Sequence, residues 1–112
     1  MKLRAELIQG GVLLSLALAI CAWPGRADDA AATLFKAKCA ACHGPDGAGK
    51  TPAGAAMKVR DLRSDEVQKQ SDADLTATIT KGKNKMPAFG GKLQKEEIDQ
   101  LVAYVRGLAK GK

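Results

Sequence analysis

The chain has 112 residues and a formal net charge of +6. That length fits one small domain and excludes a multidomain enzyme, a TIM barrel or a complete dinucleotide-binding fold. The positive charge is modest and no nucleic-acid recognition motif accompanies it, so binding to nucleic acid is not expected.

The N-terminal segment 1–27 is predicted to be a cleaved signal peptide. Lys2 and Arg4 give it a positive start, the run 10–23 is almost wholly apolar, and Gly25 and Ala27 place small residues before the cut. An uncleaved anchor is the alternative, but the apolar run is shorter than the 18 or so residues of a spanning helix. Lipid attachment at Cys21 is disfavoured, because Ile20 and not a small residue precedes it. The exported domain is therefore expected to comprise residues 28–112, in a bacterial periplasm.

The exported part begins with a predicted helix and continues in a loop. Alanine, leucine and lysine dominate residues 29–42, and no helix breaker interrupts them. Glycine and proline recur through 44–56, which indicates a loop. A short helix is predicted over 64–70, with Ser64 as its N-cap.

Two further helices are predicted in the second half of the chain. Ser71 is placed to cap a helix that ends near Lys81, just before Gly82. The last helix is expected over 95–109, although Gln94 is a poor N-cap. One face of it carries apolar residues at intervals of three and four: Ile98, Leu101, Val102, Val105 and Leu108. No segment alternates as a strand does, so the domain is predicted to be all-α.

Aromatic residues are scarce in residues 28–112, and disulfides cannot compensate, since the two cysteines there are three positions apart. Those cysteines belong to the sequence Cys39-Ala40-Ala41-Cys42-His43, the C-x-x-C-H motif that attaches c-type haem. A spacing of nearly one helical turn brings both thiols to one side, where they can bond the two vinyl groups of one haem edge. His43 then points at the iron. A covalently bound haem c, with its iron, is therefore expected to complete the core.

Other uses of a C-x-x-C pair fit the remaining residues poorly. A structural zinc site needs four ligands, and beyond the leader the chain has only two cysteines and one histidine. A thioredoxin-like dithiol needs a βαβ context, which the helical pattern lacks. A plain short disulfide is disfavoured as well, because so small a ring cannot staple a fold.

The sixth iron ligand is predicted to be Met86. A methionine opposite histidine raises the haem potential, which suits an electron carrier. Met86 lies in a glycine-bounded loop, and Pro87 after it restricts its backbone to extended conformations. Met57 is the alternative, but it follows His43 closely and is expected to fill space in the core.

Together, CAACHG, KNKMPAFG and the amphipathic C-terminal helix resemble the class I monohaem c-type cytochromes. The resemblance implies a cytochrome c fold of four to five short helices around one haem, with the first and last helices crossing. It implies that Phe35 and Tyr104 pair at that crossing, where Ala31 replaces the frequent glycine. It also implies a loop carbonyl that accepts from the second ring nitrogen of His43, with Pro52 preferred over Pro45.

The function that these features predict is electron transfer by a monomer between redox proteins, with no enzymatic residues and no stable membrane insertion. The alternatives are a haem enzyme or ligand sensor with an open sixth site, and a cytochrome subunit of a dehydrogenase complex. A run of lysines without an intervening acid surrounds Met86 and predicts docking to acidic partners: Lys81, Lys83, Lys85, Lys92 and Lys95.

Overall fold

The computed structural model describes residues 26–111 and confirms the predicted all-α class. The elements are α1 (Arg26–Lys38), α2 (Ala40–His43), α3 (Pro52–Met57), α4 (Asp65–Gln68), α5 (Asp72–Lys81), α6 (Lys95–Leu108) and the 3-10 turn η1 (Ala109–Gly111). Within this range, none of the helices is long and apolar enough to cross a membrane. The predicted signal peptide lies outside the described residues, except for Arg26 and Ala27, which start α1.

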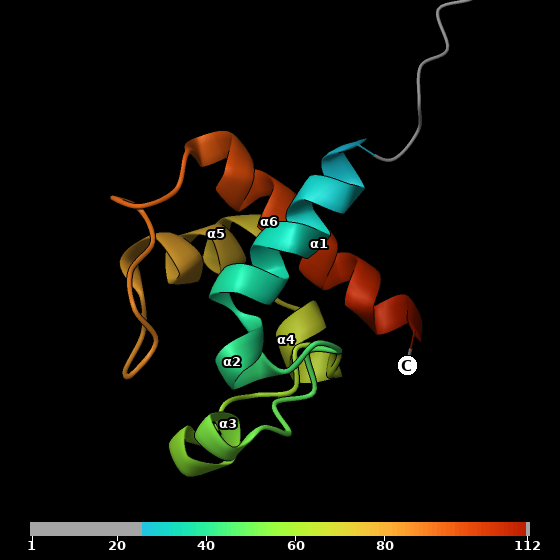
Figure 1. Cartoon of the computed structure of the whole chain (residues 1–112), viewed down its shortest axis with the longest axis vertical. Helices are drawn as coiled ribbons and strands as arrows, with labels where there is room; N and C mark the ends of the chain where they lie inside the picture. Colours follow the sequence, from blue (N-terminus) through green and yellow to red (C-terminus); the bar gives the residue numbers. More distant parts are fainter. Residues whose placement is uncertain (1–25, 112) are drawn as a thin grey trace, which may run out of the picture.

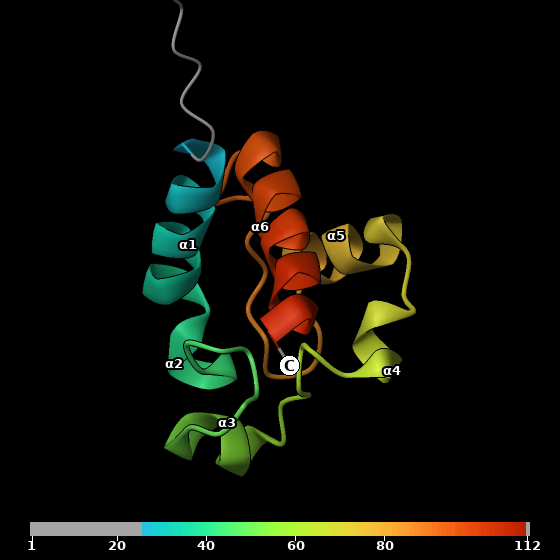
Figure 2. The same ribbon diagram turned by 90° about the vertical axis from the view of Figure 1, so that its right-hand side faces the viewer.

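The first and last helices are in contact, as expected. α1 passes across α6 in Figure 1, and the two helices stand side by side in the perpendicular view of Figure 2. At the contact, the Phe35 and Tyr104 rings have centroids 4.9 Å apart and planes tilted by 40°. Ala31 is 3% exposed, so a methyl group fits at this crossing. The aromatic pair implied by the resemblance is confirmed.

The core lies on the predicted apolar face of α6. Ile98, Leu101, Val102 and Val105 are buried there, while Leu108 at the end of the helix is half-buried. Phe35 of α1, Val67 of α4 and Leu75 of α5 form one cluster with Leu101, Val102 and Val105. Burying each such side chain stabilises the fold by about 1.5–3 kcal/mol relative to exposure.

Helix starts follow the predicted caps. The Ser64 hydroxyl accepts from the Val67 N–H at 3.4 Å at the start of α4, and the Ser71 hydroxyl accepts from the Asp74 N–H at 3.0 Å at the start of α5. At α6, the Glu97 carboxylate accepts from the Gln94 N–H at 3.3 Å. Glu97 therefore compensates for the weak cap expected from Gln94.

Two segments differ from the prediction. The helix expected over 29–42 breaks at Cys39, where φ is −119°, so the rest of the haem-attachment motif forms a separate turn, α2. The loop expected over 44–56 contains the beginning of α3, which Thr51 caps and Pro52 opens. Proline suits the first helical position because its fixed φ matches the helix and its missing N–H would lack a partner there.

Candidate functional site

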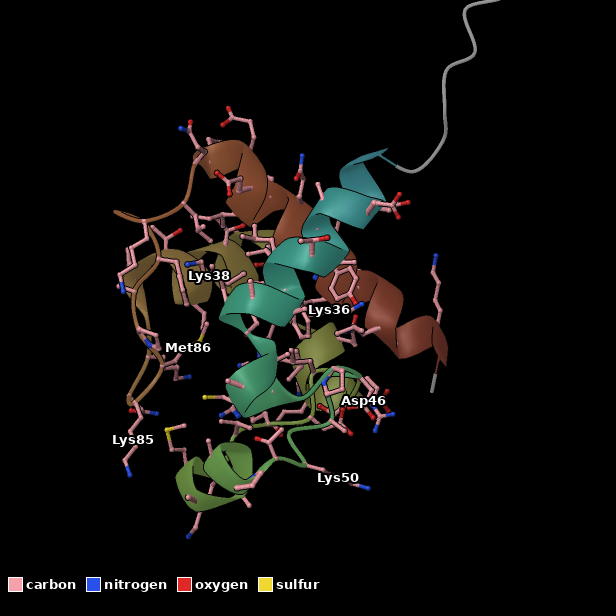
Figure 3. All side chains as sticks on the ribbon, viewed as in Figure 1. Lys36, Lys38, Asp46, Lys50, Lys85 and Met86 are labelled. Carbon is pink, nitrogen blue, oxygen red and sulfur yellow. The ribbon has the colours of Figure 1, made fainter. Side chains whose placement is uncertain are left out.

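A large pocket gathers the four residues predicted to bind the cofactor: Cys39, Cys42, His43 and Met86. It holds about 1420 Å³ of space, counted with its open mouth. Figure 3 shows Met86 on the side of its loop that faces α1 and α2, whereas Lys85 points outward. Cys39 lies just before α2, Cys42 and His43 lie in it, and Met86 follows more than 40 positions later, so the fold brings two distant segments to one site.

The single turn of α2 aligns the two thiols. The Cys39 carbonyl accepts from the N–H of Cys42 at 3.2 Å and from that of His43 at 2.9 Å. Both cysteines are half-buried and are not joined in a disulfide. Burial, together with the neighbouring Cys42, raises the pKa of the Cys39 thiol to about 11. Both cysteines line the pocket without a disulfide between them, so both sulfur atoms are available to bond a cofactor.

His43 lines the same pocket with one ring nitrogen buried and unpaired. Its Nδ1 has no hydrogen-bond partner among the described residues. Burial lowers the pKa of His43, and the backbone of Arg60 partly offsets that lowering. The ring is thus held in its neutral form, which is the form that binds a metal ion. The expected hydrogen bond from Nδ1 to the Pro52 carbonyl is wrong: Pro52 opens α3, and its carbonyl does not reach the ring.

A tight turn presents Met86. Its N–H donates to the Lys83 carbonyl at 2.9 Å, and its carbonyl accepts from the Lys83 N–H at 3.2 Å. Asn84, inside the turn, has φ of +54°, a left-handed conformation that asparagine tolerates better than most residues. The two bonds close the turn on itself, so the Met86 backbone is fixed.

Glycine and α5 hold this turn in place. Gly82 has φ of +72°, and a Cβ there would lie 2.6 Å from the Met86 carbonyl oxygen. Beyond the turn, the Phe89 N–H donates to the Ile79 carbonyl at 2.9 Å and the Gly90 N–H donates to the Thr80 carbonyl at 3.0 Å. The methionine loop is therefore anchored at both ends.

The helix that carries Met57 and some of the cationic residues of the pocket were missed by the sequence analysis. Met57 lines the pocket from the end of α3, a helix that the glycine-rich sequence concealed although Thr51-Pro52 is a good helix start. Cationic side chains also line the pocket: Lys38, Lys58, Arg60, Lys83 and Lys85. None of its described lining residues carries a carboxylate. Nothing in the local sequence around Lys38 or Arg60 indicates this position.

The lining fits a haem. Its walls are largely apolar side chains of the core, including Phe35, Leu75 and Leu101, which suit the porphyrin ring. Two thiols, one neutral imidazole and one thioether are the groups that attach and ligate haem c. The zinc alternative gains no support, because no group of three or more metal-binding His, Cys, Asp or Glu side chains occurs within 26–111.

Comparisons with known proteins agree with this fit. Residues 26–105 match the family described as Cytochrome C oxidase, cbb3-type, subunit III. The chain is 39% identical over 102 residues to cytochrome c6 of Nostoc sp., covering 88% of this chain and 89% of that protein. It is 42% identical over 81 residues to cytochrome c6 of Anabaena variabilis, covering 70% and 87%. The solved structure of KustC0563 c-type cytochrome matches with a TM-score of 0.65 and 35% identity, over 70% of this chain and 95% of that one.

Proposed function

The chain belongs to the monohaem c-type cytochromes, the family of cytochrome c6 and of cbb3 oxidase subunit III, and from this premise we propose that it carries single electrons between redox proteins. Family membership implies one haem c bound covalently through Cys39 and Cys42. In the proposed carrier, His43 and Met86 are the axial ligands of the iron. The observation that carries the proposal is that both residues line one pocket with the two cysteines.

A rigid methionine supports a carrier over an enzyme. When bound, the haem supplies an iron that changes between the ferrous and ferric states. The chain's part is to keep both axial positions filled while that happens, and the closed turn from Lys83 to Met86 suits this role. No described carboxylate lines the pocket, so no acid–base pair is at hand for chemistry on a substrate.

The charge around the pocket supports docking to acidic redox partners. Lys83 and Lys85 line the pocket and are exposed, and Lys81 and Lys92 are exposed nearby in the sequence. Lys95 differs, because its ammonium donates to the Asp99 carboxylate at 2.7 Å. Cations around a cofactor edge steer an acidic partner toward it, and salt screens that attraction. Electron transfer to such a partner should therefore slow as ionic strength rises.

The place of action in this proposal is the periplasm, after removal of residues 1–27. The support is the order of positive start, apolar run and small residues in the sequence. Covalent haem attachment fits an exported protein, and the carrier is proposed to act as a monomer. Mass spectrometry of the purified protein tests the cut after Ala27.

The decisive experiment is a visible spectrum of protein made with a c-type haem maturation system. Haem that survives acid–acetone extraction, with a weak far-red ferric band from iron–sulfur ligation, is expected. The variant Met86→Ala should lose that band, whereas the matched control Met57→Ala should keep it. Retained haem without the band in the wild type would instead indicate an open site, and peroxide and gas-binding assays would follow. Loss of haem on extraction would contradict covalent attachment.

A further inference from the structure

The end of the haem-attachment turn has an unusual support. A helix leaves its last carbonyls without intrahelical partners, and α2 has only four residues. Here the Cys42 carbonyl accepts from the Thr51 hydroxyl at 2.9 Å, and the His43 carbonyl accepts from the Gly49 N–H at 2.7 Å. Both partners lie in the loop that leads to α3. The backbone on either side of the His43 ring is thus held by one returning segment.

The Thr51 hydroxyl makes two bonds at once. It donates to the Cys42 carbonyl and accepts from the Gly54 N–H, also at 2.9 Å. A hydroxyl has one donor hydrogen and two lone pairs, so both bonds can be made together. The second bond is the N-cap of α3. One side chain therefore joins the end of α2 to the start of α3.

Gly54 lets the two helices approach at backbone distance. A Cβ on Gly54 would collide with the Cys42 carbonyl oxygen, and it would lie 2.5 Å from the Gly49 carbonyl oxygen. Gly54 is itself buried. The contact between α2 and α3 is therefore made by main-chain atoms, where a displacement of one helix moves the other.

The His43 ring is held less directly: the Arg60 backbone raises its pKa, but Nδ1 makes no hydrogen bond of ordinary geometry with the described residues. A histidine that ligates a metal usually donates its other ring N–H to a carbonyl or carboxylate, which fixes the ring. In this protein, Nδ1 is buried without such a partner among the described residues. The orientation of the ring then depends on the backbone that carries it.

From these contacts we infer that Thr51 is a positioning residue for the axial histidine: its hydroxyl fixes the Cys42–His43 backbone and so sets how firmly the His43 ring binds the iron. The inference rests on the proposed role of His43 as an iron ligand. A less firmly held imidazole donates less to the iron, which stabilises the ferric state less. The midpoint potential should therefore rise when the hydroxyl is lost.

The test compares holoproteins with Thr51→Val, which has the same shape without the hydroxyl, and with Thr51→Ser, which keeps it. Thr51→Val should raise the midpoint potential and shift the NMR signals of the His43 ring, and Thr51→Ser should restore both. The control Ser64→Ala removes another N-cap, that of α4, and should lower the melting temperature without moving the potential. A Thr51→Val protein with the wild-type potential and ring signals would overturn the inference.

Two further readouts separate the possible failures. The far-red band in each variant reports axial ligation by Met86, so its absence from the wild type would contradict the proposed function and not the role of Thr51. The wild-type holoprotein should also show a Thr51 hydroxyl proton that exchanges slowly with water, because that proton is held between two segments. Fast exchange would overturn the inference even if Thr51→Val gave no stable holoprotein.

Discussion

Phe35 and Tyr104 join the two ends of the fold, with ring centroids 4.9 Å apart. Phe35 is 1% exposed and also lines the haem pocket, whereas Tyr104 is half-buried on α6. The crossing of the terminal helices and the cofactor site therefore share one side chain. A substitution that disturbs the crossing should therefore also disturb the cofactor site.

The first prediction concerns this pair. Phe35→Ala should lower the free energy of unfolding of the holoprotein by about 3–5 kcal/mol, because a buried ring is lost. Tyr104→Phe keeps both rings and should change it by less than about 0.5 kcal/mol. Denaturant unfolding followed by haem absorbance measures both. Equal losses in the two variants would show that the tyrosine hydroxyl, not the ring pair, stabilises the crossing.

Gly82 should control the position of Met86. An alanine there would adopt φ of +72° at a cost of about 1–2 kcal/mol, and its methyl group would press on the Met86 carbonyl. Gly82→Ala should therefore weaken or abolish the far-red band. Gly91→Ala is the matched control, since no atom lies within 4 Å of a Cβ there. An intact band in Gly82→Ala would mean that the turn can shift without releasing the methionine.

Lys58 ends α3 in a left-handed conformation, with φ of +52°. The Val59 N–H donates to the Gly54 carbonyl at 3.0 Å across this residue, which is the closure that glycine usually provides. Lys58→Gly should therefore stabilise the holoprotein, by about 0.5–1 kcal/mol. Lys69→Gly, at a right-handed position with φ of −76°, should destabilise it by a similar amount. Thermal melts of both variants give the comparison. A lower melting temperature in both variants would contradict the claim that the left-handed backbone at Lys58 is strained.

Without haem, the chain should be largely unfolded. Most of its buried core also lines the pocket, and those side chains would face water: Phe35, Val67, Leu75, Phe89, Leu101, Val102 and Val105. Circular dichroism of the apoprotein should show little helix and no cooperative melt. A cooperative thermal transition would contradict this expectation.

The thiols offer an independent check on the apoprotein. In the folded structure the pKa of Cys39 is raised to about 11, so the folded state holds the thiol proton at a pH where an unfolded chain has lost it. Ionisation therefore favours unfolding between the ordinary thiol pKa of about 8.5 and about 11. In an unfolded apoprotein, the rate of Cys39 alkylation should rise with pH around the ordinary thiol pKa. A profile displaced toward pH 11 would indicate that the apoprotein folds.

Much of this structure follows from local sequence signals. Ser64 and Ser71 mark the starts of α4 and α5 because a serine hydroxyl accepts from an N–H three residues on. The spacing of apolar residues in α6 predicts its buried face, since both depend on the helical repeat. The motif from Cys39 to His43 predicts the cofactor because the residues that attach the haem lie close together in the sequence.

The differences arise where distant segments decide the geometry. No residue near Cys39 is a helix breaker, so the break between α1 and α2 has no local signal. Gly54 lowers the helix propensity of α3, yet the close approach of α2 requires a glycine there. The unpaired Nδ1 of His43 likewise depends on where the later loop passes, which spacing from the motif does not specify.

The bonds from Phe89 and Gly90 to the last carbonyls of α5 divide the methionine segment from the rest of the molecule. Residues 82–88 lie between two anchored ends, and the bonds between Lys83 and Met86 close within this segment. The position of Met86 in the pocket is therefore set by the bonds within its own segment and by α5. A substitution that loosens the end of α5 should therefore also displace Met86 from the pocket.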